Sequence, residues 1–310
     1  MIKICFAGLG SIGQRHIRNL TGILNEKKED YIIDAVRKGK KELPEDIRAI
    51  IHTEYDSIRD IPYDYDIFFV TNPTINHYET IREATLHAKH LFIEKPVFDK
   101  PLQTWYDLCL KKNHIYYVAC PLRYSSCFEY IKTMIENEKI YSVRSISSSY
   151  LPQWRKETDY RKSYSADSKR GGGVTLDLIH ELDYLTSLFG MPEKTFHVRG
   201  KYSDLEITSD DLSVYILQYP DKLVEIHLDY FGRSMVRTME LFCQQYTICC
   251  DFIHNRIYRH NAEKNTEAVD TGEKDMYKNE MQAFLEMIEG KRDNINSIQH
   301  ANEVLKLALL

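Results

Sequence analysis

The segment GGGVTLDLIHELDYL, residues 171–185, joins three glycines to a run with helical spacing in which Asp177, His180 and Asp183 stand three residues apart. Residues at this interval share one face of a helix, so we expect the three polar side chains to point the same way. An imidazole can give and take a proton at neutral pH, and a nearby carboxylate can orient it or a substrate. The alternative is a partly buried structural histidine, but the glycines would let a ligand approach the backbone. The segment therefore predicts acid–base chemistry by Asp177 and His180.

Lys95 is a second candidate, because it follows an apolar run in the segment FIEKPVF, residues 92–98. Ligands of open α/β sheets bind at the carboxyl ends of the parallel strands, which is where this lysine is expected. Pro96 favours extended backbone at the preceding residue, so the amine can reach out over a bound cofactor. A lysine at a strand end is more often a solvated charge. Between Glu94 and Pro96 after an apolar run, it is a better candidate for chemistry.

A glycine loop opens the chain. Gly8, Gly10 and Gly13 form G-x-G-x-x-G between an apolar strand at 2–7 and an amphipathic run at 14–24. In this context the glycines permit a tight turn, close approach of a pyrophosphate, and close packing of helix on strand. The helix N-terminus adds unpaired N–H groups. A merely tight turn is the alternative; we expect the loop to bind a dinucleotide through Gly8, Gly10, Ser11, Ile12 and Gly13.

The residues after the second strand bear on cofactor choice. Strand 31–36 (YIIDAV) is followed by Arg37 and Lys38, whereas an NAD site usually has a carboxylate at this tip. Asp34 lies inside the strand. Because a guanidinium can bind a 2′-phosphate through two hydrogen bonds, the sequence predicts that NADP is preferred and NAD possible, with Lys38 or Lys40 assisting. The alternative is a solvated basic loop.

The order of expected elements indicates two domains. Strands are expected at 2–7, 31–36, 49–53, 66–70, 90–93 and 115–119, and helices at 14–24, 76–88 (with Asn76 as N-cap) and 101–112. Alternation of this kind builds a parallel sheet. Beyond Pro121 we expect a helix at 125–138, a strand at 143–151, six strands between 195 and 260, and a closing helix at 276–290. The predicted fold class is α/β. An N-terminal Rossmann domain (1–121) precedes a C-terminal α+β domain (122–310) with a large, mainly antiparallel open sheet.

Composition excludes several classes of protein. The 310 residues are 43% hydrophobic and 28% charged, and 41 basic residues face 46 acidic ones, which gives no reason to expect binding to nucleic acid or an anionic membrane. No apolar run reaches the roughly 20 residues of a membrane span, and the N-terminus does not read as a signal peptide. Seven scattered cysteines without metal-ligand spacing suggest reduced thiols in a cytoplasmic protein and no metal site.

Four spaced motifs together give a more specific indication. They are AGLGSIGQRH (7–16), TNPTINH (71–77), EKP (94–96) and GGGVTLDLIHELD (171–183). With them the chain closely resembles the glucose-fructose oxidoreductase / inositol dehydrogenase / rhizopine-catabolism (Gfo/Idh/MocA) superfamily, over nearly its whole length. The resemblance implies a Rossmann domain and a C-terminal domain whose open sheet often forms dimers or tetramers through its outer face. We therefore expect a homodimer or homotetramer.

The resemblance also implies roles for individual residues. Lys95 matches the family lysine that contacts substrate and nicotinamide, and Asp177 and His180 match the active-site aspartate and histidine. The usual spacing of that pair is four rather than three, so Glu181 is the alternative to His180. Further residues expected at the cofactor are Thr71, Asn72, Pro73, His77, Glu94 and Arg123.

The function that follows is NAD(P)-dependent hydride transfer between nicotinamide and a secondary alcohol of a sugar, amino sugar or nucleotide sugar. The resemblance leaves two alternatives, a redox-cofactor-dependent glycosidase and a non-catalytic dinucleotide-sensing regulator. Retention of Lys95, Asp177 and His180 argues against the regulator. Whether a dehydrogenase or a redox glycosidase is present stays open at this point.

Overall fold

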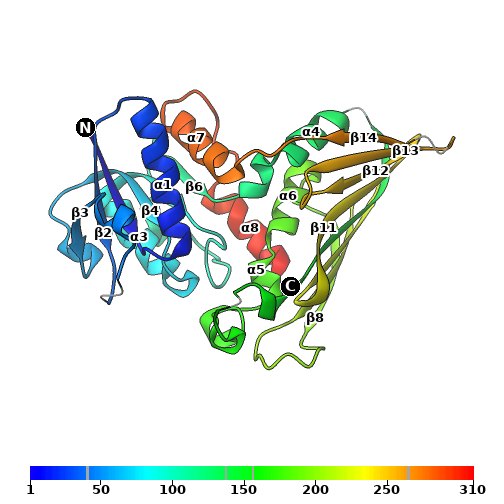
Figure 1. The fold of residues 1–310 in the computed structure, drawn as a ribbon, viewed down its shortest axis with the longest axis horizontal. Helices are drawn as coiled ribbons and strands as arrows, with labels where there is room; N and C mark the ends of the chain where they lie inside the picture. Colours follow the sequence, from blue (N-terminus) through cyan, green and yellow to red (C-terminus); the bar gives the residue numbers. More distant parts are fainter. Residues whose placement is uncertain (40–41, 137, 156, 264–265) are drawn as a thin grey trace. The chain divides into compact units, whose positions relative to one another are not determined.

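The computed structural model describes residues 1–39, 42–136, 138–155, 157–263 and 266–310. It divides into two compact units, which Figure 1 shows in the colours of the sequence. The first unit comprises Met1–Pro121 and Tyr277–Leu305, and the second comprises Leu122–Met276 and Lys306–Leu310. The first unit thus also includes a late segment of the chain. The predicted folding domains 1–121 and 122–310 remain a prediction.

The first unit is built on a parallel six-stranded sheet with the order β3-β2-β1-β4-β5-β6. Its strands are β1 (Ile2–Ala7), β2 (Tyr31–Val36), β3 (Ile51–Tyr55), β4 (Tyr65–Val70), β5 (Ala88–Ile93) and β6 (Tyr116–Val118). The central strands are buried on both faces, as their apolar runs predict. Phe6 on β1 stacks on Phe69 on β4 with ring centroids 4.2 Å apart. The predicted Rossmann architecture is confirmed.

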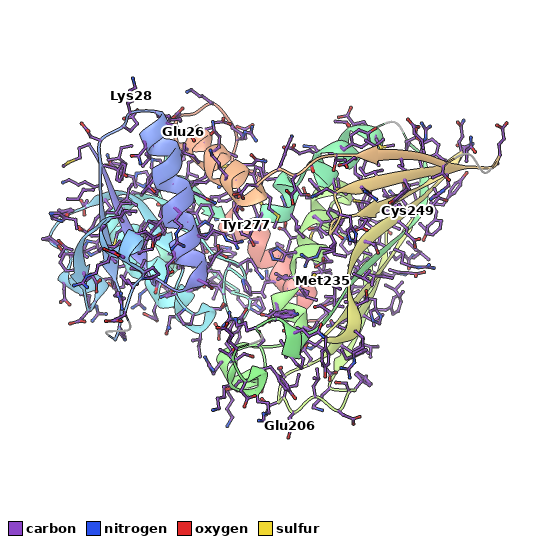
Figure 2. All side chains as sticks on the ribbon, viewed as in Figure 1. Glu26, Lys28, Glu206, Met235, Cys249 and Tyr277 are labelled. Atoms are coloured by element: carbon purple, nitrogen blue, oxygen red, sulfur yellow. The ribbon has the colours of Figure 1, made fainter. Side chains whose placement is uncertain are left out.

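Some helices of this unit lie between its strands in the chain, and others come from the late segment. They are α1 (Ser11–Glu26), α2 (Glu45–Arg48), α3 (His77–His87), α7 (Met276–Ile288) and α8 (Ile298–Ala308). Helix α8 was not predicted. In Figure 2, Glu26 marks the end of α1, and Tyr277 lies near the start of α7. The next residue, Lys278, links the two helices, since its Nζ lies 2.9 Å from Oε1 of Glu26. Asn76 precedes α3 as expected, but its side chain makes no capping hydrogen bond.

The helix predicted at 101–112 is wrong. This segment contains only a 3₁₀ turn, Tyr106–Leu108, which ends at Cys109 in the left-handed region. Only Leu108 of the segment is buried, so a helix here would have no apolar face to pack. The side chain of Asn302 also bonds both backbone groups of Leu102, at 2.8 and 3.0 Å. These hydrogen bonds occupy the backbone N–H and C=O groups of Leu102, which a helix would use for its own hydrogen bonds.

The second unit contains an eight-stranded sheet with the order β14-β13-β12-β11-β7-β10-β9-β8. Its strands are β7 (Ile140–Tyr150), β8 (Lys194–Gly200), β9 (Leu212–Gln218), β10 (Leu223–Asp229), β11 (Phe231–Cys243), β12 (Tyr246–Asp251), β13 (Arg256–Asn261) and β14 (Thr266–Asp270). Among the described strands, β7 and β10 pair in parallel and the other neighbours pair antiparallel. The predicted large, mainly antiparallel sheet is confirmed, although β14 was not foreseen.

One face of this sheet carries the helices α4 (Ser126–Met134), α5 (Val174–Asp177) and α6 (His180–Phe189), as Figure 1 shows. Alternate residues of β9 are buried, which is the pattern of a sheet with one covered face. Apolar side chains also stand exposed on the strands, among them Phe196 on β8 and Met235 on β11, the latter labelled in Figure 2. Across the described residues, no helix is long and apolar enough to cross a bilayer.

Candidate active site

The three glycines of the loop between β1 and α1 have different surroundings. Gly8 has φ +96°, and a Cβ there would lie 2.7 Å from the Cα of Asn72. A Cβ on Gly13 would lie 2.5 Å from the carbonyl oxygen of Gly8. A Cβ on Gly10 would meet no atom within 4 Å, and this residue is exposed where α1 begins. Two glycines therefore allow the chain to pack on itself, and the third keeps the helix N-terminus open.

This loop fits the pyrophosphate of a dinucleotide. Ser11 and Ile12 form the first turn of a 16-residue helix, whose N–H groups and dipole favour phosphate at that end. The Thr71 hydroxyl donates a hydrogen bond to the carbonyl oxygen of Gly8 at 2.6 Å, which fixes the loop against the end of β4. When bound, the dinucleotide supplies a hydride acceptor or donor at its nicotinamide.

Two buried histidines hold the backbone on either side of Lys95. His16 Nε2 lies 2.5 Å from Glu94 Oε1, and His16 is completely buried. His77 places Nδ1 3.0 Å from the Pro96 carbonyl oxygen and Nε2 2.9 Å from that of Asn72. The residues before and after Lys95 are thus anchored to α1 and to the start of α3. Lys95 itself is half-buried.

The electrostatics of this segment follow from the same contacts. Burial raises the pKa of Glu94, but the hydrogen bond and the positive charge of His16 outweigh burial and leave the pKa below its usual value. Burial lowers the pKa of His77 despite the carbonyls that it contacts. His77 was predicted to line the cofactor, and in the structure both of its ring nitrogens face backbone carbonyls. His16 was missed as a site residue although it lies in the motif at 7–16.

Arg37 directly follows β2, with a carboxylate beside it. Its Nη1 lies 3.5 Å from Oε1 of Glu54 on β3. No carboxylate follows β2 in the sequence, but the structure brings one to this strand end from the neighbouring strand β3. Lys38 is exposed, and Lys40 lies outside the described residues.

Asp34 cannot serve as an alternative ribose ligand. The residue is completely buried in β2. Its carboxylate accepts hydrogen bonds from the hydroxyls of Tyr63 and Tyr65, the latter at 2.8 Å. Asp34 therefore ties β2 to β4 inside the first unit.

The segment 171–185 forms two helices, so the expectation of one helix with a shared polar face is wrong. Helix α5 ends at Asp177 and α6 begins at His180. Between them Leu178 has φ −103° and ψ 27°, which interrupts the helical repeat. His180 is half-buried at the start of α6. The helical repeat is therefore interrupted between Asp177 and His180.

Asp177 is held by tyrosine hydroxyls. Its carboxylate is buried and accepts a hydrogen bond from Tyr230, with the oxygen atoms 2.5 Å apart. Tyr164 also donates to Asp177, and burial together with this carboxylate raises the pKa of both tyrosines. Trp154 packs edge-on against the Tyr230 ring at 5.3 Å. The carboxylate is thus fixed in direction.

Sequence reasoning missed Tyr164 and Tyr230. Tyr230 lies 53 residues beyond Asp177 and shares no motif with it. Only the pairing of distant strands and loops brings these hydroxyls to the carboxylate, so no local spacing could have indicated them.

The acidic neighbours of His180 point into the second unit. Glu181 is completely buried, and its Oε1 lies 2.8 Å from Nε of Arg237 on β11. Asp183 accepts from Arg123 Nε and Nη2 at 2.8 and 2.7 Å, and the Arg123 side chain is 3% exposed. Of the two alternatives, this placement favours His180 as the accessible group. The contact of Arg123 with cofactor or substrate remains a prediction.

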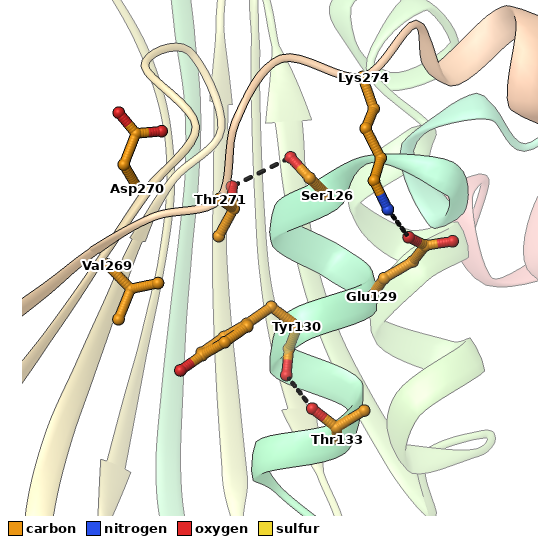
Figure 3. Close-up of a pocket in the computed structure, with 8 residues that line it drawn as sticks. All are labelled: Ser126, Glu129, Tyr130, Thr133, Val269, Asp270, Thr271 and Lys274. Atoms are coloured by element: carbon orange, nitrogen blue, oxygen red, sulfur yellow. Dashed lines mark hydrogen bonds and ion pairs between the residues drawn. The ribbon is translucent and has the colours of Figure 1, made fainter.

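A hollow of about 390 Å³ lies elsewhere in the second unit, as Figure 3 shows. It is lined by Ser126, Glu129, Tyr130, Thr133, Val269, Asp270, Thr271 and Lys274. Two of its charged wall residues are paired with one another, since Lys274 Nζ lies 3.0 Å from Glu129 Oε2. It contains none of the predicted site residues. In the part of the chain that the structure describes, no group of three His, Cys, Asp or Glu residues is placed to hold a metal ion.

Comparison with known families agrees with this architecture. Residues 2–120 match the oxidoreductase family with an NAD-binding Rossmann fold, and residues 132–244 match the C-terminal alpha/beta domain of the same family. The chain belongs to the Gfo/Idh/MocA oxidoreductase family. The resemblance seen in the four motifs is thereby confirmed.

Curated relatives are distant. The uncharacterized oxidoreductase YrbE of Bacillus subtilis is 27% identical over 198 residues, which are 62% of this chain and 55% of that protein. The uncharacterized oxidoreductase sll0816 of Synechocystis is 24% identical over 157 residues, 50% of this chain and 39% of that protein. The matched parts span about half the length of these relatives or less.

Solved structures share the fold over nearly the whole chain. UDP-N-acetylglucosamine 3-dehydrogenase GnnA from Acidithiobacillus ferrooxidans has a TM-score of 0.78 and 17% identity, covering 99% of this chain and 95% of that one. Levoglucosan dehydrogenase in complex with NADH and levoglucosan has a TM-score of 0.82 and 16% identity, with the same coverage. An oxidoreductase from Agrobacterium radiobacter in complex with NAD⁺, L-tartaric acid and magnesium has a TM-score of 0.78 and 13% identity, covering 99% and 94%.

Proposed function

We propose that this oxidoreductase is an NAD(P)-dependent dehydrogenase that transfers a hydride between nicotinamide and a secondary alcohol of a sugar, amino sugar or nucleotide sugar. The observation that carries the proposal is the buried Asp177 carboxylate, oriented by two tyrosine hydroxyls at the end of α5, with the half-buried His180 at the start of the next helix. Two solved relatives of the same fold are named as dehydrogenases of a nucleotide sugar and of levoglucosan. Both names support a sugar-type substrate.

The roles of the residues follow from their chemistry. In the oxidation direction the alcohol carbon would lose its hydrogen with the electron pair, as a hydride, to a bound nicotinamide, and His180 would take the hydroxyl proton, which leaves a carbonyl. Asp177 orients His180 or the substrate hydroxyl, because its own direction is set by Tyr230 and Tyr164. Lys95 polarises the substrate oxygen. Because its neighbours Glu94 and Pro96 are anchored by His16 and His77, the backbone from which the Lys95 side chain extends is held in place.

The preferred cofactor is proposed to be NADP. Arg37 directly follows β2, and its guanidinium can pair with a 2′-phosphate. Replacing Arg37 with Asp is expected to weaken NADP binding by about 10- to 100-fold and to leave NAD binding unchanged or improved. Calorimetric titration of both cofactors checks this. Equal affinities, or tighter NAD binding, in the unmodified protein would contradict the preference.

A homodimer or homotetramer is also proposed, through the exposed face of the sheet in the second unit. Phe196 and Val198 on β8 are 63% and 59% exposed, more than is usual for apolar side chains on a sheet. Light scattering should show an oligomer at micromolar concentration, and a strict monomer would count against it. A cytoplasmic location stays a prediction from the cysteine pattern.

A substrate screen tests the function. The purified protein is incubated with sugars and nucleotide sugars and with NAD or NADP, and the absorbance of the reduced cofactor is followed. At least one compound should yield reduced cofactor in proportion to the alcohol oxidised. Cleavage of a glycoside without net reduction would instead identify a redox glycosidase. Dinucleotide binding without turnover of any compound would favour a regulator.

A further inference from the structure

Arg37, which we propose selects the cofactor, lies beside the carboxylate of Glu54, and the two side chains differ in exposure. The Arg37 side chain is 11% exposed, whereas that of Glu54 is 47% exposed. The surroundings of Arg37 therefore restrain its position, and Glu54 can rotate away from it into solvent. This asymmetry makes the carboxylate the movable member of the pair.

The pair lies where a Rossmann unit meets the adenosine ribose. The Arg37 N–H donates to the Tyr55 carbonyl oxygen at 3.0 Å, so the residue after β2 is still bonded to β3. Glu54 lies opposite Ala35 in the parallel register. Both side chains thus belong to the carboxyl ends of adjacent strands, the edge at which dinucleotides bind.

Two contacts of the guanidinium, with Glu54 and with Gly39, are long. Nη1 lies 3.5 Å from Glu54 Oε1, and Nη2 lies 3.4 Å from the Gly39 carbonyl oxygen. Hydrogen bonds of normal strength are shorter, so neither acceptor holds the guanidinium tightly. A 2′-phosphate brings more charge than a carboxylate and can displace Glu54 from the guanidinium.

We propose that Glu54 is a determinant of cofactor specificity whose carboxylate competes with the 2′-phosphate of NADP for Arg37. It thereby reduces the preference for NADP that Arg37 alone would give. NAD presents a neutral hydroxyl at this position and leaves the ion pair intact. This inference rests on the proposed dinucleotide-dependent function.

The size of the effect follows from the interaction between charges. Two unit charges about 4 Å apart in water interact by about 1 kcal/mol, which corresponds to about a 5-fold change in affinity, and partial burial increases this. Replacing Glu54 with Gln should therefore strengthen NADP binding by about 5- to 20-fold and change NAD binding by less than about 2-fold.

The experiment is calorimetric titration of NAD and NADP into the unmodified protein and into four variants. The single variants are Glu54→Gln, Arg37→Gln and Glu29→Gln, and the double variant is Arg37→Gln/Glu54→Gln. Glu29 is exposed at the amino end of β2, so Glu29→Gln removes the same charge far from the strand edge in question. Thermal unfolding confirms that each variant is folded. Competition predicts a gain in NADP affinity for Glu54→Gln, no gain for Glu29→Gln, and at most about a 2-fold gain from the second change in the double variant.

Two outcomes would overturn the proposal. One is an NADP to NAD affinity ratio that Glu54→Gln leaves unchanged. The other is a gain of the same size when Arg37 is absent, which would show repulsion through space rather than competition for the guanidinium. Failure of the proposed function has different signatures: the folded, unmodified protein would bind neither dinucleotide at millimolar concentration, or it would bind them and turn over no compound in the substrate screen.

Discussion

The glycine loop of the first unit and the Asp177–His180 segment of the second unit are built in opposite ways. The residues of the loop lie close together in the chain, and the structure uses the end of β4 as the backbone wall against which Gly8 packs, while Gly13 packs on Gly8 and Gly10 is left open. The Asp177 carboxylate takes its direction from Tyr230, which lies 53 residues further along the chain. The loop can therefore be recognised from a short sequence, whereas the partner of Asp177 is brought to it only by the assembled unit.

This difference determines how each region should respond to substitution. A change at Gly10 should alter ligand binding with few consequences elsewhere, because no protein atom lies within 4 Å of its Cβ position. A change around Asp177 should propagate, because the buried charges of the following helix α6, Glu181 and Asp183, are paired with residues from other elements. Three sets of substitutions and one dependence on pH test this contrast between the two units.

The largest effect is expected at the ion pair of the second unit. Replacing Arg123 with Leu leaves the Asp183 carboxylate without its bidentate partner in a site where the arginine is 3% exposed. Breaking a buried pair typically costs about 3–5 kcal/mol of unfolding free energy. The double replacement Arg123→Leu/Asp183→Leu should recover much of this loss. Urea denaturation measures both, and an unchanged midpoint for Arg123→Leu would show that the pair contributes nothing to stability.

At the glycine loop, ligand binding should change without loss of the fold. Gly10→Val introduces a side chain into space that holds no protein atom within 4 Å, so the protein should fold normally. Its dinucleotide affinity should fall by about 100-fold or more, since the pyrophosphate needs that space. Gly8→Ala is the matched contrast, because φ +96° and the backbone of Asn72 make it destabilising. Calorimetry and thermal unfolding distinguish the two; normal affinity in folded Gly10→Val would refute the placement of the pyrophosphate.

A smaller effect is expected at the tyrosine that orients Asp177. Tyr230→Phe removes the hydroxyl at 2.5 Å and keeps the ring that packs on Trp154. Turnover should fall by about 10-fold, which is less than the full contribution of general acid–base catalysis because the catalytic groups themselves remain. Dinucleotide affinity should stay constant. Tyr215→Phe is the control, because the Tyr215 hydroxyl donates to the Ala308 carbonyl oxygen and has no proposed catalytic role. Equal turnover in Tyr230→Phe and the unmodified protein would remove Tyr230 from the site.

The smallest effect is a dependence of stability on pH in the first unit. Burial, with the nearby charges of His114 and Lys89, lowers the pKa of His90 from 6.5 to about 4, and burial also lowers the pKa of His77. The unfolded chain therefore takes up protons first, so stability is complete above about pH 6.5 and falls between pH 6.5 and 4. His90→Gln should reduce this loss by about 1 kcal/mol after allowance for solvent screening. Urea midpoints at several pH values test it, and an identical pH profile in the variant would contradict the assignment.

The same comparison explains what the sequence could predict. The Rossmann sheet, the large antiparallel sheet and the glycine loop depend on local periodicity and on residues close together in the chain. The helix expected at 101–112 failed because Asn302, about 200 residues away, bonds the backbone of Leu102. Glu54 beside Arg37 was missed because it arrives from an adjacent parallel strand. Side chains supplied across strands leave no trace in the spacing of a motif.

The central claim is that Lys95 and His180 serve one hydride-transfer reaction. The most direct test is the rate of nicotinamide reduction with the substrate found in the screen, measured for Lys95→Ala, His180→Ala and the unmodified protein under saturating cofactor. Each variant should keep its melting temperature and cofactor affinity and lose turnover by about 100-fold or more. Normal turnover in either folded variant would contradict the claim for that residue.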